Sequence, residues 1–502
     1  MSARATGALR GARFIPGLVA ALALPPTAAA QGLPDTPSGR LAGRFVALIN
    51  GAAGPGDLEF ASGVMSPAFL AAMPADSTAW WFDLIRQQSG GVTVDTAVTM
   101  GRTSVLDVTT RRTGRRAQLF FGSAEGDTTR LAFVGVVPQV YQYAGDPPAL
   151  PGGRVPPDSV MAPVLRLLEW ASAHDIFAGT VLIRRGNSIV LDRSFGLRNR
   201  EARLVNSIPT RYHTGSWGKM MTAVAIGQLV DRGKFRFEDT LMAVLPEYPD
   251  PEAARKITIH HLLTHQSGLG GLFDRPGWTV ERPFARQADM FPLFAGTPLA
   301  FEPGKGVGYS NEAFVVLGAI VEKYSGMSLA EYFERRIWKP AGMKGICDCL
   351  SRRDEPLRAV GYASFEDRDP FGIEPFSDNE HFLGKSIANG AGGWYATPRD
   401  FTNFMDALMA GKLVKRTTVA RLTTPVVSLR GGPEPDYGYG FQLQKFGGKP
   451  AIGHGGGGQR VGIGVQSRMF ADGSWTVALF GNGDQPPVNR LARQILEYLA
   501  RQ

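Results

Sequence analysis

The sequence predicts an α/β protein in two parts: a small α+β domain, then a larger domain in which an antiparallel sheet with flanking helices lies beside a helical region. Three observations predict this. Strand-like apolar runs stand near both ends of residues 160–502, with helical patterns between them. Residues 31–145 have helical spacing first and alternating runs afterwards. A segment rich in proline and glycine, residues 146–159, reads as a linker between the two parts.

The first thirty residues, 1–30, have the features of a secretory signal peptide. Three arginines precede an apolar stretch, Phe14–Leu24, and three alanines close the segment. The alternative is an uncleaved membrane anchor, but prolines keep the apolar run shorter than a bilayer span. We therefore expect cleavage after this segment and a periplasmic or secreted protein.

Composition narrows the class of partner. The chain of 502 residues is 44% apolar and 20% charged, as globular proteins are. Loss of residues 1–30, with three arginines and no acid, lowers the formal charge from +9 to +6. No basic stripe interleaved with aromatic residues is present, which argues against a nucleic-acid partner. No later stretch suits a stable membrane span, and the sequence leaves the oligomeric state unknown.

Residues 31–145 are expected to form the small α+β domain. Helical spacing indicates three helices, over Leu41–Ile49, Pro67–Met73 and Ser77–Gln88. Alternating runs bounded by turns indicate four strands, over Val92–Met100, Val105–Thr110, Ala117–Phe121 and Leu131–Val136. This order of elements resembles that of NTF2-like accessory domains, and we find no catalytic constellation in it.

Residues 160–502 are expected to form the larger domain. Two hairpins and two terminal helices frame it. The helices are expected over Val164–Ala173 and Val488–Leu499, and the strands over Gly179–Arg184, Ser188–Phe195, Val461–Met469 and Trp475–Phe480. Glycine and asparagine in the first hairpin turn suit a tight two-residue connection.

The two cysteines, Cys347 and Cys349, are separated by one residue. A disulfide across one residue is expected to be strained, since the two Cα atoms rarely reach suitable geometry. A metal site would need further ligands, and none stands nearby. We interpret the pair as free or loosely paired thiols without an assigned role.

Ser216 and Lys219 form the most informative motif. They open an almost wholly apolar run, Met220–Val230, that predicts a buried helix. A serine in the first turn and a lysine three residues later lie on one face of that helix. An alcohol needs a base to become a nucleophile, and a buried amine with a lowered pKa can serve. A helix-capping serine beside an incidental lysine is the alternative, but a buried lysine without a purpose is costly.

The second motif is Tyr309-Ser310-Asn311, which precedes an apolar helix over Ala313–Val321. A tyrosine beside a cationic lysine can have its pKa lowered enough to share the role of base. Asn311 can donate to a substrate amide and hold the lysine. The tripeptide alone also fits an ordinary helix start.

The third motif is His454-Gly455-Gly456-Gly457, which we place immediately before the strand expected at Val461–Met469. Glycines there would let a substrate lie close to a strand edge, and would free a backbone N–H to join that of Ser216 in an oxyanion hole. The alternative is a flexible glycine loop. A phosphate loop is disfavoured because no Gly-Lys-Ser/Thr sequence follows.

In this order the three motifs resemble those of the serine β-lactamase, DD-peptidase and esterase superfamily, specifically its class C-type branch. The resemblance covers residues 160–502 and extends to residues 246–249, 257–269 and 389–394. It implies a β-lactamase/transpeptidase-like fold and no cofactor or metal. The roles that it implies are nucleophile for Ser216, base for Lys219 and Tyr309, and substrate or oxyanion contacts for Asn311, His454, Gly456 and Gly457.

Two residues depart from the pattern of that superfamily. His454 stands where β-lactamases usually have lysine, and a histidine is mostly neutral at pH 7. We therefore expect a weaker grip on a substrate carboxylate, which favours esters, amides and peptides over β-lactams. Trp217 directly follows the serine, and we expect its ring to narrow the site.

Other motifs compete with this interpretation. Ser377-Asp378-Asn379 matches the second motif of class A enzymes, but Tyr309 already fills that place. His261 and His265 have the spacing of a helical zinc pair, but no glutamate follows His261 and no third ligand is evident. No G-x-S-x-G elbow occurs, which argues against the usual α/β-hydrolase signature.

Two classes of function remain. The first is an exported serine hydrolase that forms an acyl-enzyme on an ester, an amide or a D-amino-acid peptide. The second is a non-catalytic module of the same fold that binds peptidoglycan or peptides. Retention of all three chemical groups favours the enzyme, because a binder needs none of them.

Overall fold

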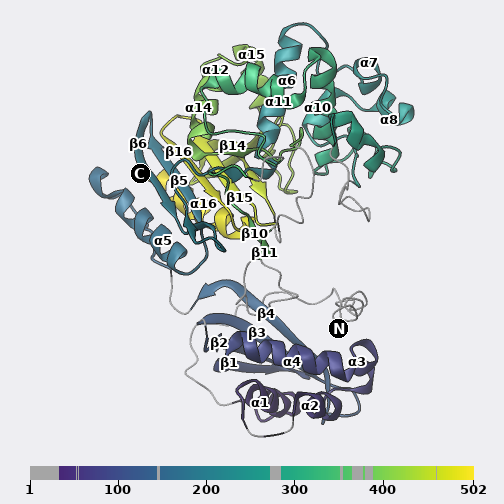
Figure 1. The fold of residues 1–502 in the computed structure, drawn as a ribbon, viewed down its shortest axis with the longest axis vertical. Coiled ribbons are helices and arrows are strands. Elements are labelled where there is room, and N and C mark those ends of the chain that lie inside the picture. Colours follow the sequence, from purple (N-terminus) through teal and green to yellow (C-terminus); the bar gives the residue numbers. More distant parts are fainter. Residues whose placement is uncertain are drawn as a thin grey trace. The chain divides into compact units, whose positions relative to one another are not determined.

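A computed structural model describes residues 33–502, except residues 53, 55, 113, 144–146, 272–283, 351–353, 364–376, 379–387 and 459–460. The described chain forms two compact units, one before residue 144 and one from residue 147 (Figure 1). The expected signal peptide lies outside the described residues.

The first unit has helices against one four-stranded antiparallel sheet of order β1-β2-β3-β4. Its elements are α1 (Pro37–Ile49), α2 (Asp57–Val64), α3 (Pro67–Ala72), α4 (Ala75–Ser89), β1 (Val92–Met100), β2 (Thr103–Thr110), β3 (Arg115–Ser123) and β4 (Leu131–Tyr143). Four phenylalanines from three helices and one strand meet in its core: Phe45, Phe60, Phe82 and Phe121. Helix α2 was not expected from the sequence, and β4 continues to Tyr143, beyond the expected end at Val136. The other helices and strands of this unit agree with the prediction to within a few residues.

The second unit is built on a six-stranded antiparallel sheet of order β13-β14-β15-β16-β5-β6. Its strands are β5 (Gly179–Arg185), β6 (Ser188–Phe195), β13 (Gln442–Phe446), β14 (Lys449–Gly457), β15 (Gly464–Phe470) and β16 (Trp475–Gly481). Strand β16 pairs with β5, so the two predicted hairpins join in one sheet although nearly 300 residues separate them. The mixed α/β fold with strands drawn from both ends of the domain is confirmed.

Helices cover both faces of this sheet (Figure 1). Helices α5 (Met161–Ala173) and α16 (Gln485–Ala500) bury their apolar residues against one face. On the other face lies the helical region, centred on α6 (Lys219–Asp231), α10 (Asn311–Ser325) and α14 (Pro398–Met409). Its shorter helices are α7 (Leu241–Val244), α8 (Pro251–Lys256), α9 (Ile259–Leu263), α11 (Leu329–Phe333), α12 (Lys339–Ala341) and α15 (Arg416–Leu422).

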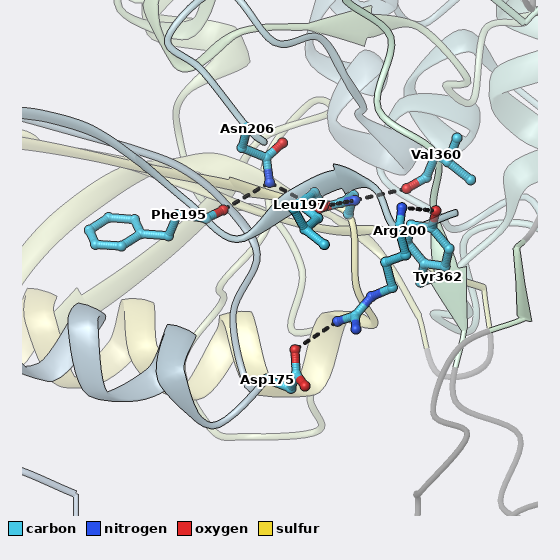
Figure 2. A network of polar contacts seen from close by, with 8 residues as sticks. Asp175, Phe195, Leu197, Arg200, Asn206, Val360 and Tyr362 are labelled. Atoms are coloured by element: carbon cyan, nitrogen blue, oxygen red, sulfur yellow. Dashed lines mark hydrogen bonds and ion pairs between the residues drawn. The ribbon is translucent and has the colours of Figure 1, made fainter. Parts of the chain in front are cut away.

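Short strands connect the sheet to the helical region. They are β7 (Leu197–Asn199), β8 (Leu204–Val205), β9 (Tyr212–His213), β10 (Tyr362–Ala363), β11 (Ser377–Asp378) and β12 (Tyr395–Ala396). Figure 2 shows how polar contacts fasten residues 360–362 to the segment after β6. The Tyr362 hydroxyl accepts from the Arg200 backbone N–H at 2.6 Å, and the Arg200 guanidinium donates to Asp175 at 2.9 Å. Asn482 donates to the carbonyls of Leu197 and Val360.

The cysteine prediction was wrong. Cys347 and Cys349 form a disulfide, with their Cα atoms 5.3 Å apart. This separation lies inside the usual range for a disulfide. Cys347 also exchanges two backbone hydrogen bonds with Tyr395, which tie the disulfide to β12.

Within the described part of the chain, no single helix has the length and apolar composition to cross a membrane. Only α10 together with residues 329–341, a pair bent by 75°, would satisfy both criteria jointly.

Candidate active site

Ser216 lies in a short 3₁₀ turn, Gly215–Gly218, that leads directly into α6. Helix α6 is buried over residues 219–229, because nearly all of its side chains are apolar and it crosses the middle of the core. The Trp217 ring points into this core and donates from Nε1 to the Ser467 hydroxyl at 3.1 Å. The expectation that Trp217 narrows the site is therefore wrong, and the ring anchors the serine turn to β15.

Lys219 is completely buried and its Nζ contacts three oxygens. The distances are 3.2 Å to Ser216 Oγ, 2.7 Å to Asn311 Oδ1 and 3.0 Å to the carbonyl of Ala391. Burial lowers the pKa of Lys219 to about 7, against the opposing attraction of the Glu312 carboxylate. Near neutral pH much of the amine is therefore unprotonated, with a lone pair available 3.2 Å from the serine oxygen.

Tyr309 and Asn311 stand at the start of α10, which Ser310 caps by accepting from the Ala313 N–H. The Lys219 ammonium lies 4.8 Å from the centroid of the Tyr309 ring. Burial raises the pKa of Tyr309, while interaction of its hydroxyl with Ser216 opposes that rise. The residue is nevertheless 45% exposed, so solvent limits the upward shift of this pKa. The expected lowering of this pKa is wrong, because desolvation outweighs the partly neutral amine.

The glycine motif forms part of β14 and is not a loop before the next strand. A Cβ atom on Gly456 would lie 1.8 Å from the Thr214 carbonyl oxygen and 3.1 Å from the Ser216 nitrogen. A Cβ atom on Gly215 would in turn lie 2.6 Å from the Gly457 nitrogen. Only glycine allows this approach, which places the backbone N–H groups of Ser216 and Gly457 beside each other.

His454 is buried in the protein with a partner for each ring nitrogen. Its Nδ1 contacts the carbonyl of Gly455, and its Nε2 lies 3.2 Å from the Tyr437 hydroxyl. A carbonyl can only accept, so Nδ1 carries the proton and Nε2 accepts from Tyr437. Burial lowers the pKa of His454 to about 3, which keeps the ring uncharged. His454 thus has no free nitrogen for the substrate contact that the sequence predicted.

Residues 389–394 form another part of the site and pack against the serine turn Gly215–Gly218. It supplies the Ala391 carbonyl that accepts from Lys219. Gly392 allows it to come close, since a Cβ atom there would lie 1.9 Å from the Gly215 carbonyl oxygen. Thr222 donates to the carbonyl of Gly390 at 2.7 Å and fastens the segment to α6. The sequence singled out this segment but gave no role to any residue in it.

The competing motifs find no support among the described residues. His261 caps α9 and His265 lies beyond the end of that helix, and no cluster of three potential metal ligands occurs in the described ranges. Ser377 and Asp378 form β11, which pairs with β10, and Asn379 lies outside the described residues.

The structure therefore brings together Ser216, Lys219, Asn311, Gly456 and Gly457, with the Tyr309 ring beside them. Chemically the site offers a hydroxyl, an amine with a lowered pKa, a phenol and paired backbone donors. Such a set can attack a carbonyl carbon and stabilise the oxyanion that results. Sequence reasoning missed the Ala391 carbonyl, because a backbone acceptor has no side-chain signature, and it missed Tyr437.

Comparisons with known proteins bear on this arrangement. The family model for Beta-lactamase matches residues 164–500. The chain is 29% identical over 267 residues to a putative penicillin-binding protein, PbpX, of Bacillus subtilis, covering 53% of this chain and 62% of that protein. It is 31% identical over 264 residues to the esterase EstB of Burkholderia gladioli, covering 47% of this chain and 66% of that protein. The chain thus spans a little under two thirds of the length of these relatives.

Solved structures agree on the fold. A penicillin-binding protein from Bacillus halodurans superposes with a TM-score of 0.55 at 29% identity, covering 68% of this chain and 98% of that one. The D-amino acid amidase of Ochrobactrum anthropi superposes with a TM-score of 0.56 over 68% of this chain and 98% of that one. At 18% identity the second likeness shows the fold alone.

Proposed function

The chain belongs to the beta-lactamase family, and from that premise we propose that it is a serine hydrolase that forms an acyl-enzyme through Ser216. The observation that supports this most directly is the position of a buried, partly neutral Lys219 amine 3.2 Å from the Ser216 hydroxyl. A buried amine is costly unless its neutral form has a use, and removal of the serine proton is that use.

The first half-reaction would proceed by nucleophilic attack. Lys219, assisted by Tyr309, takes the proton of Ser216 while Oγ forms a bond to the substrate carbonyl carbon. The N–H groups of Ser216 and Gly457 stabilise the oxyanion. The tetrahedral intermediate then collapses, and the leaving alcohol or amine departs with a proton from Lys219 or Tyr309, which leaves an ester on Ser216.

The second half-reaction would reverse these roles with water. The same base takes a proton from a water molecule that attacks the ester carbonyl, and Ser216 leaves with its proton restored. Asn311 holds Lys219 in place throughout, since its Oδ1 lies 2.7 Å from Nζ. This cycle needs no other reactant, because the chain supplies both the nucleophile and the base.

We propose a neutral ester, amide or D-amino-acid peptide as the substrate class. Two relatives, an esterase and a D-aminopeptidase of Brucella ovis, bear names of this kind. The charge of the site favours neutral acyl groups, because His454 is uncharged and engaged within the protein. We also propose export, on the strength of residues 1–30; N-terminal sequencing of protein recovered from the producing cells would show whether cleavage occurs after residue 30.

Covalent labelling tests the proposal. Wild-type protein should react with a fluorescent fluorophosphonate and hydrolyse p-nitrophenyl esters, and Ser216→Ala should lose both activities. Ser188→Ala, an exposed serine at the start of β6, is the matched control and should behave as wild type. Labelling that survives in Ser216→Ala would refute the assignment of the nucleophile. No labelling and no turnover of esters, amides or D-alanyl peptides by wild type would favour the binding module instead.

A further inference from the structure

His265 adopts a backbone conformation that calls for an explanation. Its φ is +60°, in the left-handed region that residues other than glycine seldom enter, although asparagine, aspartate and histidine enter it more often than the rest. It lies just beyond α9, where a glycine would relieve the strain. A strained residue persists only where its surroundings require its side chain, and such residues gather at functional sites.

The contacts of His265 surround Tyr309. Its backbone carbonyl accepts from the N–H of Gly308 at 3.0 Å, and its Nδ1 accepts from the N–H of Ser310, also at 3.0 Å. The ring of His265 stacks on the ring of Tyr309, with centroids 4.4 Å apart and planes inclined by 28°. The His265 side chain therefore fixes the residue after the tyrosine and the plane of the tyrosine ring, while its backbone carbonyl holds the residue before.

Tyr309 needs such support. It lies in a segment without regular structure, and the residue is 45% exposed. An exposed tyrosine ordinarily samples several rotamers, while proton transfer requires its hydroxyl to stay near Ser216. The other described ring contact at this phenol is the Lys219 ammonium, 4.8 Å from its centroid. The histidine, with no exposed surface, gives the ring a rigid wall on one face.

The hydrogen-bond pattern requires the neutral ring. Because Nδ1 accepts from Ser310, the proton must reside on Nε2, which has no hydrogen-bond partner among the described residues. The ring is packed between Tyr309, Phe314 and Tyr437. A buried donor without a partner is unfavourable, so packing alone would have favoured an apolar side chain here.

We propose that His265 is a positioning residue that holds the Tyr309 hydroxyl in its working place and acts on catalysis only through that hydroxyl. This inference rests on the proposed function, in which Tyr309 assists Lys219. It assigns to the segment of residues 257–269 a role that none of the three motifs carries.

A double-mutant cycle with Tyr309→Phe tests the inference. His265→Asn tolerates the left-handed backbone and keeps an oxygen that can accept from Ser310, but it removes the stacked ring. Tyr309→Phe keeps the ring and removes the hydroxyl. We expect His265→Asn to lower kcat for p-nitrophenyl esters about 10- to 100-fold with little change in KM. In the Tyr309→Phe background the same substitution should change kcat by less than about threefold, since no hydroxyl remains to be positioned.

The outcomes separate this inference from the proposed function. Equal losses in both backgrounds would show a general structural role and overturn the inference, while Ser216 would remain the nucleophile. No loss in His265→Asn, or none in Tyr309→Phe, would overturn it as well. Turnover by Ser216→Ala would instead refute the proposed function. His261→Asn, in the same segment and without contact to Tyr309, controls for loosening of the segment and should keep kcat within about twofold. Thermal unfolding of each variant verifies that it is folded.

Discussion

The pH dependence of acylation follows from the environment of Lys219. Burial lowers the pKa of this amine to about 7, so the neutral base predominates above that pH and the ammonium below it. Because only the neutral amine can take the serine proton, kcat/KM should rise with pH and level off above pH 8. From the protonation equilibrium, the value at pH 6 should be about a tenth of the plateau, and at pH 5 about a hundredth.

Lys219 is the group in the described site that should titrate in this range. Burial lowers the pKa of His454 to about 3, so this imidazole stays neutral between pH 5 and 8. Burial also lowers the pKa of His265 well below its ordinary value, and the hydrogen bond that its Nδ1 accepts from Ser310 requires the neutral ring. Burial moves the pKa of Tyr309 upward, away from the same window. A plot of log kcat/KM against pH is therefore expected to show a single acidic limb with a slope of one.

The assay is kcat/KM for an uncharged p-nitrophenyl ester from pH 5 to 9, corrected for spontaneous hydrolysis, with circular dichroism at each pH. Lys219→Arg is the matched variant, because it keeps the positive charge but holds its proton throughout this range. It should lose about 10²- to 10⁴-fold in activity, and the acidic limb near pH 7 with it. A flat wild-type profile, a midpoint near the ordinary lysine pKa, or wild-type rates in Lys219→Arg would show that Lys219 is not the base.

Three further predictions concern the surroundings of the base. Asn311→Asp places a carboxylate where the amide oxygen lies 2.7 Å from Lys219 Nζ, so it should raise the pKa of Lys219. The acidic limb of the pH profile should then move to higher pH by about one unit or more. An unmoved limb would contradict this prediction. Gly456→Ala would bring a Cβ atom to 1.8 Å from a carbonyl oxygen and should lower kcat at least about 100-fold, whereas Gly458→Ala, with its nearest atom at 3.6 Å, should keep it. His454→Lys should raise the ratio of nitrocefin turnover to neutral ester turnover about tenfold or more. It should also lower Tm, because the new cation is buried. An unchanged ratio would show that His454 does not determine specificity.

Much of the fold was predictable because its signals are local. The hairpin of β5 and β6 has two apolar runs around a tight turn, and α6 is an almost wholly apolar run with a glycine beyond its end. Helix α2 was missed because it is only 8 residues long, and its N-cap, Gly56, makes no side-chain capping bond. Short helices of this kind owe their stability to packing, here of Phe60 in the core, which no local pattern records.

Strand β14 shows the opposite case, in which local propensity opposes the fold. Glycine lowers strand propensity, so the glycine run at its end looks like a loop in the sequence. It is a strand because β15 pairs with it. Its residues are glycines because the backbone of Thr214 and Gly215 leaves no room for a Cβ atom beside it. The requirement comes from residues some 240 positions earlier, and a window along the sequence cannot contain it.

In the site, too, some contacts follow from local spacing and others join distant segments. Ser216 and Lys219 share one helical turn, so their proximity follows from spacing alone. The bonds from Lys219 to Asn311 and Ala391 cross 92 and 172 residues, and the second acceptor is a backbone carbonyl without a side-chain signature. His265 was considered as a zinc ligand, because its spacing from His261 was visible while its stacking on Tyr309 was not.

The electrostatics of the site link these observations to the choice of substrate. Among the described groups that surround Ser216, the titratable cation is Lys219, and the proposed reaction requires it to be neutral. The other favourable interactions come from backbone dipoles at Ser216 and Gly457, which act on an oxyanion and are indifferent to charge elsewhere in the substrate. His454 is uncharged and engaged with Tyr437, so it supplies no fixed positive charge for an acyl group that carries a carboxylate. Such a site would stabilise the transition state of acyl transfer but gain little from an anionic substrate, which is why we propose neutral esters and amides, and not β-lactams, as its substrates.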